Sequence, residues 1–413
     1  MSAAIRHVLH LGWSPVAAVE ALSALGAAVT CAVEPADLAA ARASPYPDRV
    51  VAVADCTSAE AVAAGLARVG LDPAGFDAVS PANELELVAA SLLGAAIGAP
   101  GLPYPAALAV RDKYVQKTLV RAAGVPVTEC RVLESFEGGV LAPFGDAPVV
   151  IKPLAGAGAA NTFLVSGEEE LAALPIAAGS PGLWLAERFV DGPELHLDGV
   201  IRQGELLDVA VSRYLHNVIR IKAGQETGSV GLRPDRFPEL YVAAGDLIRR
   251  VARALSYPDG VFHAEAFLQP DGLLIFSELG GRVGGGGISV VWRDVRGVDI
   301  HEEWARCVLG LPSAVPAEPR RTAGTSGWIN LRGRPGRVLA APKVAELERQ
   351  PGVIYGEVKA TAGKVTPEIT GSSSTRAGRA VVVGPDEDVV EARLRAVSAW
   401  LHAHIKVAEQ EEG

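Results

Sequence analysis

Two glutamates, Glu265 and Glu278, belong to neighbouring apolar segments whose pattern does not explain a carboxylate. Residues 261–268 form the first segment, and the second begins at residue 273, after the sequence Gln-Pro-Asp-Gly. Pro followed by Asp-Gly is typical of a turn, so we expect a β-hairpin. Side chains alternate along a strand, so a two-residue or a four-residue loop places both glutamates and His263 on one face. A three-residue loop would place the two carboxylates on opposite faces.

Opposed carboxylates repel each other, but they can share a divalent cation. Mg²⁺ prefers carboxylate oxygens and commonly shares phosphate ligands as well. If the register slips and one glutamate points to solvent, no such site forms. The hairpin is followed by Gly280, Gly281, Arg282 and a run of four glycines, a composition unsuited to the interior of a helix or strand. This segment suits backbone packed against a ligand, with Arg282 available to an anion, although an ordinary flexible loop has the same composition.

A lysine at the end of an apolar strand is a second candidate. Residues 148–153 end in Ile-Lys-Pro, and a buried strand rarely ends in a lysine such as Lys152 without a partner for its charge. A loop of small residues follows at 156–162. Its successive backbone N–H groups could surround phosphate oxygens, although tight hairpin loops look similar. Lys152 beside the loop favours the phosphate interpretation.

Polar residues also alternate along the strand predicted at 194–201. Glu194, His196 and Asp198 share one face of it, which is either a solvated face or the polar rim of a pocket. Arg220 and Lys222 are two apart and lie on one side if their segment is extended. Four residues are candidate substrate contacts on polarity and position alone: Glu84, His216, Arg220 and Lys222.

Strands and helices alternate through the first hundred residues. The predicted strands lie at 6–11, 29–33, 50–53 and 76–79, with helices between and after them, including 58–69 and 84–97. This alternation indicates a parallel, doubly wound sheet. The first strand-to-helix turn has a single glycine, so the dinucleotide fingerprint is absent and NAD binding is not expected.

The rest of the chain mixes helices with hairpins. We predict helices at 106–124, 240–255 and 387–405, and a glycine-punctuated β region at 352–384. Residues from about 320 onward contain no catalytic motif. They indicate a capping subdomain, with residues 372–376 a surface loop that is at most near the active site.

Composition narrows the class of protein. The chain has 413 residues, 49% of them hydrophobic, and a net charge of −10, which argues against nucleic acid or an anionic membrane as the main partner. No segment looks transmembrane, and the N-terminus lacks the pattern of a signal peptide. The four cysteines are scattered without CxxC spacing, so neither a disulfide framework nor a zinc site is indicated. We expect a cytoplasmic protein, with a homodimer as one open arrangement.

Taken in order, these features resemble the ATP-grasp superfamily, and within it carboxylate–amine ligases related to L-amino-acid ligases and D-alanine–D-alanine ligase. The ordered set is Asp112-Lys113 at a helix start, Ile151-Lys152-Pro153, the loop 156–162, the segment 187–194, and the Glu265/Glu278 hairpin with Arg282. The resemblance covers most of the chain and implies a multidomain fold of the α/β and α+β classes. Its implied parts are a doubly wound pre-ATP-grasp domain (1–105), a small ATP-grasp subdomain with a Gly-rich lid (106–185), a large subdomain with hinge and metal site (186–320) and a C-terminal capping subdomain (321–413).

The resemblance also implies roles for individual residues. Lys113 and Lys152 would contact ATP phosphates, and Arg282 and Lys152 would act in catalysis, with Arg282 facing the acyl phosphate or the substrate carboxylate. Glu265 and Glu278 would hold Mg²⁺, for which Mn²⁺ is an alternative. The remaining implied nucleotide contacts are Gly156, Gly158 and Asn161 in the lid, Glu187, Phe189 and Val190 in the adenine hinge, and Glu194 at the ribose.

The implied activity is ATP-dependent joining of a small carboxylate, such as an amino acid, to a small amine or amino acid, through an acyl phosphate. One position departs from the family pattern Glu-x-Asn-x-Arg, because Gly280 stands where the asparagine would be. A water could take that position, a second Mg²⁺ could bind more weakly, or catalysis could be impaired. Two alternatives therefore remain open: an ATP-dependent carboxylase acting on bicarbonate, and a nucleotide-binding subunit without catalysis.

Overall fold

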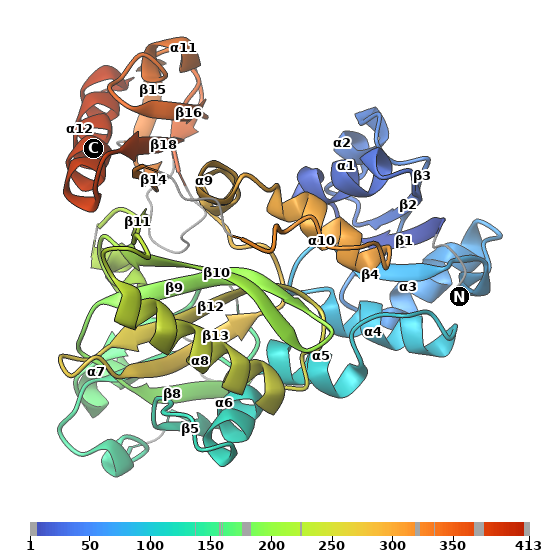
Figure 1. Ribbon diagram of the computed structural model, residues 1–413, viewed down its shortest axis with the longest axis horizontal. Helices are drawn as coiled ribbons and strands as arrows, with labels where there is room; N and C mark the ends of the chain where they lie inside the picture. The colour runs from blue at the N-terminus through green and yellow to red at the C-terminus, as the bar shows by residue number, and fades with distance from the viewer. Residues whose placement is uncertain are drawn as a thin grey trace.

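The structure is a computed structural model of the chain (Figure 1). It describes residues 6–136, 138–156, 158, 160–175, 183–223, 225–318, 323–333, 335–366 and 376–408, and at 221–223 it describes the backbone alone. Parallel and antiparallel sheets are both present, so the mixed α/β, multidomain class expected from the sequence is confirmed. None of the helices in these ranges is both long and apolar enough to cross a membrane.

The N-terminal part is a four-stranded parallel sheet in the order β3-β2-β1-β4, with helices on both faces. Adjacent residues of β1 point to opposite faces: Val8 packs with α1 in one apolar cluster, and Leu9 packs with α3 and α4 in another. The elements are β1 (His7–Leu11), α1 (Val16–Ala24), β2 (Ala28–Val33), α2 (Leu38–Ala43), β3 (Arg49–Ala52), α3 (Ala59–Arg68), β4 (Ala78–Pro81) and α4 (Leu87–Ala96).

Two helices replace the single helix predicted at 106–124, and that prediction is therefore wrong. The helices are α5 (Tyr104–Arg111) and α6 (Lys113–Ala122), and Asp112 between them is extended, with φ −95° and ψ 114°. The Asp112 carboxylate accepts hydrogen bonds from the backbone N–H groups of Tyr114 and Val115, both at 2.9 Å. This N-cap begins a new helix at Lys113 and so fixes the direction of that lysine.

A small antiparallel sheet follows, in the order β5-β8-β6-β7. It carries Lys152 on β6 and Glu187 on β8, and an apolar cluster that includes Phe144 and Ile151 packs against it. Its elements are β5 (Cys130–Leu133), β6 (Val149–Pro153), β7 (Phe163–Val165), α7 (Glu168–Ala172) and β8 (Trp184–Arg188).

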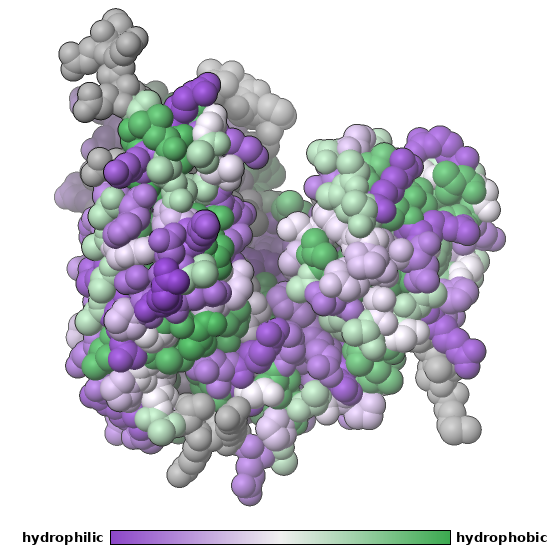
Figure 2. Space-filling view, turned by 90° about the horizontal axis from the view of Figure 1, so that it is seen from above, coloured by the Kyte–Doolittle hydropathy of each residue, from purple (hydrophilic) through white to green (hydrophobic). Residues whose placement is uncertain are grey.

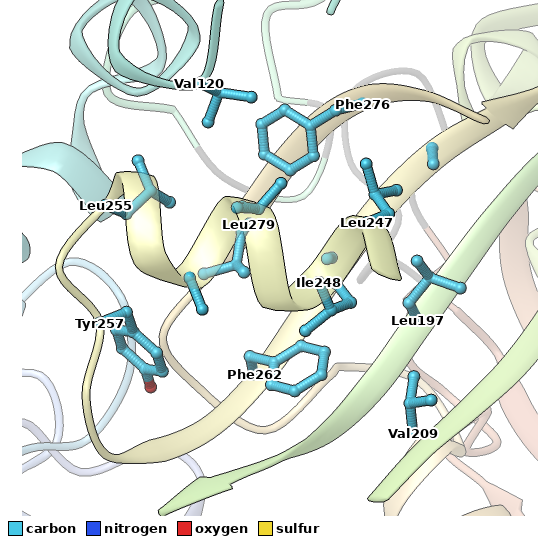
Figure 3. Close-up of a cluster of buried hydrophobic side chains, with 14 of the residues drawn as sticks. Val120, Leu197, Val209, Leu247, Ile248, Leu255, Tyr257, Phe262, Phe276 and Leu279 are labelled. Carbon is cyan, nitrogen blue, oxygen red and sulfur yellow. The ribbon is translucent and has the colours of Figure 1, made fainter. Parts of the chain in front are cut away.

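The largest sheet has eight antiparallel strands in the order β13-β12-β9-β10-β11-β14-β18-β16. Helix α8 covers one face, where Leu247 and Ile248 lie over Phe262 and Leu279 (Figure 3). The alternate residues of β12, among them His263 and Glu265, therefore point to the other face. The elements are β9 (Glu194–Arg202), β10 (Glu205–Tyr214), β11 (Gly228–Gly231), α8 (Pro238–Ala254), β12 (Gly260–Leu268), β13 (Leu274–Gly280), β14 (Thr325–Leu331), β16 (Val353–Val358) and β18 (Gly378–Gly384).

The β12–β13 hairpin changes register between its turn and its glutamates. Near the turn Leu268 pairs with Leu274, which is the alignment of a three-residue loop and would place the two glutamates on opposite faces. A bulge then shifts the register by one residue at Ser277, and Glu265 pairs directly with Glu278. The loop lengths predicted from the sequence are wrong at the turn, but both carboxylates still lie on one face.

Helices α9 (Ile288–Arg296) and α10 (Ile300–Val308) follow the glycine run and lie in the chain between β13 and β14 of the large sheet. Trp304 of α10 packs into the apolar cluster that contains Val8 and α1, so α10 joins the N-terminal part to the large sheet. Among the described residues that follow, β14, β16 and β18 continue the large sheet. The others are β15 (Gly336–Ala340), α11 (Val344–Leu347), β17 (Val365–Thr366), α12 (Glu387–His404) and β19 (Lys406–Val407).

Candidate active site

A cavity of about 660 Å³ lies between the N-terminal part, the small sheet and the large sheet. The space-filling view shows the surface hollowed between the N-terminal part and the larger body (Figure 2). Most of the residues singled out in the sequence line this cavity: Lys113, Lys152, Gly156, Gly158, Glu187, Phe189, Val190, Glu194, Glu265, Glu278 and Arg282. Asn161, His216 and Arg220 are not among the lining residues, and the side chain of Lys222 lies outside the described part of the chain.

Two lysines from different elements converge on Glu278. The Nζ of Lys113 lies 3.4 Å from Glu278 Oε2, and the Nζ of Lys152 lies 3.5 Å from the same oxygen. Lys113 Nζ also donates a 2.8 Å hydrogen bond to the carbonyl of Gly156, which ties the start of α6 to the base of the small-residue loop. Burial disfavours the ionised form of Glu278, but the charges of Lys113 and Lys152 outweigh it and hold the pKa well below its ordinary value.

Glu187 lies behind this group, between two ammonium groups. Its Oε2 is 2.9 Å from Lys152 Nζ, and its Oε1 is 2.8 Å from Lys117 Nζ. Lys117 is fully buried and also donates to the hydroxyl of Thr128 at 2.7 Å. Sequence reasoning missed Lys117, although it follows Lys113 by one helical turn and so lies on the same face of the helix.

Glu265, opposite Glu278, has two polar neighbours of its own. The hydroxyl of Tyr214 donates to Glu265 Oε1 at 3.0 Å, and His263 Nε2 lies 3.6 Å from the same oxygen. Asp198 Oδ1 lies 2.8 Å from His263 Nδ1. Burial lowers the pKa of His263, but the negative charge of Asp198 outweighs it, so the pKa is raised to about 9. These partners fix the direction of the Glu265 carboxylate.

The strand face that carries Glu194, His196 and Asp198 is buried, so the solvated-face interpretation is wrong. His196 and Asp198 are 1% and 2% exposed. His196 lies 2.6 Å from Asp198 Oδ2 through Nδ1 and 2.7 Å from the hydroxyl of Ser229 through Nε2. This chain of hydrogen bonds leads to His263 and supports the carboxylate side of the cavity.

Negative charge accumulates where the three glutamates face the cavity. Burial raises the pKa of Glu194 to about 8, and the nearby charges of Glu265 and Glu278 contribute to the same shift. A divalent cation between Glu265 and Glu278 would offset that charge, and carboxylate oxygens are ligands that Mg²⁺ prefers. The donor set therefore fits Mg²⁺, and the neighbouring lysines fit phosphate oxygens.

Arg282 reaches the cavity from the end of β13 and is held there on two sides. Its Nε lies 3.2 Å from Glu84 Oε2, and its Nη1 donates to the carbonyl of Val283 at 3.0 Å. Glu84 does not line the cavity itself, but it contacts a residue that does. The glycines after Arg282 let the backbone pack closely, because a Cβ atom at Gly286 would lie 2.4 Å from the ring of Trp328.

The C-terminal part contributes four further lining residues: Trp328 and Asn330 on β14, Arg379 on β18, and Arg376 just before β18. The Nε of Arg379 donates to Asn330 Oδ1 at 3.0 Å, while Arg376 pairs with Glu357 at 2.9 Å. Sequence reasoning found no functional motif in this region, so these cations were missed. Of the surface loop expected at 372–376, only Arg376 belongs to the described residues, and it lines the cavity.

The chain is similar to known proteins over most of its length. No protein-family model matches the chain. The chain is 26% identical over 344 residues to an L-arginine-specific L-amino acid ligase of Bacillus subtilis, an alignment that covers 80% of each protein. Its fold is similar to the crystal structure of an L-amino acid ligase from Bacillus licheniformis, with a TM-score of 0.77, 19% identity and coverage of 99% and 100% of the two chains. It is also similar to a carboxyaminoimidazole ribonucleotide synthase from Aspergillus clavatus solved with ATP, with a TM-score of 0.73, 20% identity and coverage of 96% and 99%.

Proposed function

We propose that this chain, an ATP-grasp protein by its fold, is an ATP-dependent ligase that joins a carboxylate to an amine. The observation that carries the proposal is the meeting of Lys113 and Lys152 at Glu278, directly opposite Glu265, in one cavity. A phosphoryl transfer needs alignment and positive charge around the moving group more than any other protein contribution. These residues provide both.

The reaction has two steps. A carboxylate oxygen of the acid substrate attacks the γ-phosphorus of ATP, the bond to the β,γ-bridging oxygen breaks, and ADP leaves. The nitrogen of the amine then attacks the carbonyl carbon of the acyl phosphate, loses a proton, and inorganic phosphate leaves. The product is an amide, which is a dipeptide when both substrates are amino acids.

Each group of residues has a task in these steps. Lys113 and Lys152 would bind the ATP phosphates, and Phe189 and Val190, which line the same cavity, would hold the adenine. Mg²⁺ held by Glu265 and Glu278 would neutralise charge on the phosphate oxygens. Arg282 would stabilise the transferred phosphoryl group, and the loop at 156–162 would exclude the water that hydrolyses an acyl phosphate.

The C-terminal arginines suggest where an amino-acid substrate would be recognised. Burial lowers the pKa of Arg379 to about 10, and the neighbouring charge of Arg376 acts in the same direction. An anion beside Arg379 would relieve this unfavourable charge. We assign Arg379 to the carboxylate of the amine-bearing amino acid, which keeps its carboxylate through the reaction.

The test is ADP release from ATP and Mg²⁺, measured with a panel of amino acids, with bicarbonate and with neither. Release that requires amino acids, with a dipeptide or amide identified by mass spectrometry, supports the ligase. Release that requires bicarbonate supports a carboxylase instead. Nucleotide binding without release under any of these conditions would contradict both activities.

A further inference from the structure

Glu84 approaches the cavity from the N-terminal part of the molecule, where it lies between β4 and α4. The residue is 7% exposed, and its two carboxylate oxygens face different arginines. Oε2 lies 3.2 Å from Nε of Arg282, and Oε1 lies 3.9 Å from an Nη of Arg111. Glu84 is therefore a contact between the N-terminal part and the arginine of the proposed site.

The approach of Glu84 leaves little space for a side chain at residue 280. Gly280 follows Glu278 by two positions on β13, so a side chain there would point to the cavity face. A Cβ atom at position 280 would lie 3.0 Å from Glu84 Oε2 and 3.6 Å from Cγ of Arg282. The Glu84 carboxylate thus occupies space that a side chain at 280 would need.

Arg111 extends the same contact to residues 155 and 156, where the small-residue loop begins. Its guanidinium group donates to the carbonyl of Ala155 and, at 3.4 Å, to the carbonyl of Gly156. Gly156 in turn accepts the hydrogen bond from Lys113. Glu84 therefore lies between an arginine at the base of this loop and the arginine inside the cavity.

We propose that Glu84 is a positioning residue, which holds the Arg282 guanidinium towards the reacting groups and requires glycine at position 280. The proposal rests on the ligase function proposed above. One carboxylate oxygen of Glu84 holds the Nε side of the Arg282 guanidinium. The orientation of Arg282 therefore depends on the N-terminal part, which carries Glu84. The departure from asparagine at this position then reflects the contact with Glu84 and does not indicate lost catalysis.

Four variants test the proposal: Glu84→Gln, Glu84→Ala, Gly280→Ala, and Glu84→Ala combined with Gly280→Ala. Glu84→Gln keeps the shape but loses the charge, so turnover at saturating ATP should fall about tenfold to a hundredfold, as for other residues that orient an active-site group. Gly280→Ala alone should cause a loss of similar size, because its methyl group displaces the Glu84 carboxylate. Nucleotide affinity, measured by calorimetry with ADP and Mg²⁺, should not change.

The double variant separates positioning from a general effect on structure. Once residue 84 is shortened, a methyl group at 280 meets no carboxylate, so the double variant should lose no more turnover than Glu84→Ala alone. Gly101→Ala is the matched glycine control, because a Cβ atom there has no neighbour within 4 Å. Thermal unfolding of each variant shows whether the protein has simply lost stability.

The outcomes distinguish this inference from the proposed function. If the wild-type protein forms product and Glu84→Gln forms it at the same rate, the role of Glu84 is overturned. The ligase assignment stays intact in that case. Additive losses in the double variant would equally overturn it. A wild-type protein that forms no product with any amino acid contradicts the proposed function itself, before any variant is compared.

Discussion

Arg379 and Asn330 lie directly opposite each other on β18 and β14, and the guanidinium Nε donates to the amide oxygen at 3.0 Å. Because both side chains line the cavity, the C-terminal strands bring a positive charge to the space that also contains the lysines. Two cationic regions in one cavity suit a reaction in which one anion reacts while another only has to be recognised.

Arg379→Ala should therefore raise the KM for the amine-bearing amino acid. Loss of a charge-assisted hydrogen bond costs about 1.5–3 kcal/mol, which corresponds to roughly a tenfold to hundredfold change in KM. Steady-state kinetics with each substrate varied in turn measure the effect, and the KM for ATP should stay constant. Arg395→Ala, on the exposed face of α12, is the control. Unchanged KM values for both amino acids would remove Arg379 from the substrate site.

Lys152→Ala and Glu278→Ala should each abolish ADP release while the protein remains folded. Lys152 contacts both Glu187 and Glu278, so its loss removes positive charge from the phosphate region and leaves two carboxylates underneutralised. Removal of one group that stabilises developing charge costs about a hundredfold to a thousandfold in rate. Circular dichroism and ADP release measure folding and activity, with exposed Lys364→Ala as the control. Full activity in either active-site variant would refute the assignment.

Tyr214→Phe should lower the affinity for Mg²⁺ and leave the protein folded. The Tyr214 hydroxyl directs Glu265 through a 3.0 Å hydrogen bond, and loss of such a partner to a metal-binding carboxylate lowers metal affinity about tenfold to a hundredfold. ADP release titrated with Mg²⁺ gives the change in half-saturation. Tyr46→Phe is a matched control, since Tyr46 makes a 3.0 Å bond to Glu20 on the exposed surface of the N-terminal part. Equal Mg²⁺ curves for Tyr214→Phe and wild type would contradict this role.

Stability should fall in mild acid because of His10. This imidazole is fully buried beside the hydroxyl of Ser80 and the ring of Trp304, and burial lowers its pKa from 6.5 to about 4. Between those two values the unfolded chain binds a proton that the folded chain excludes, so the free energy of unfolding decreases as pH falls. The contribution of this group is about 3 kcal/mol once both values have been passed.

A variant without the titrating group checks this prediction. His10→Gln should show a smaller drop in melting temperature than wild type between pH 7 and pH 4.5. The comparison cancels carboxylates elsewhere, because both proteins contain them. Equal drops in the two proteins would show that His10 contributes nothing to acid sensitivity.

Local sequence patterns predicted many of the strands, and the helices α1, α3, α4, α8 and α12, because these elements depend on neighbours in the chain. The parallel β1–β4 region and the Lys152 strand follow from alternation and from runs of apolar residues. The pattern failed where one residue decided the outcome. Asp112 ends one helix and caps the next. Ser277 forms a bulge that brings Glu265 and Glu278 back to the same face, after a turn of a length that the sequence did not predict.

The site was less predictable where its members come from distant elements. The burial of His196 and Asp198 depends on β10 and on the glycine run after Arg282, neither of which local alternation can place. Likewise, Arg379 reaches the cavity only because β18 pairs with β14. Lys117 is the exception, since its spacing of one helical turn from Lys113 is visible in the sequence.

The sharing of one sheet by β11 and β14 has a consequence for anyone recombining this chain with a related one. Gly228 pairs with Ile329 so closely that a Cβ atom at 228 would lie 2.6 Å from the carbonyl oxygen of Trp328. A graft that exchanged the last part of the chain would have to keep that glycine and its alignment. Otherwise it would leave an exposed strand edge, prone to self-association, where the donor segment should dock.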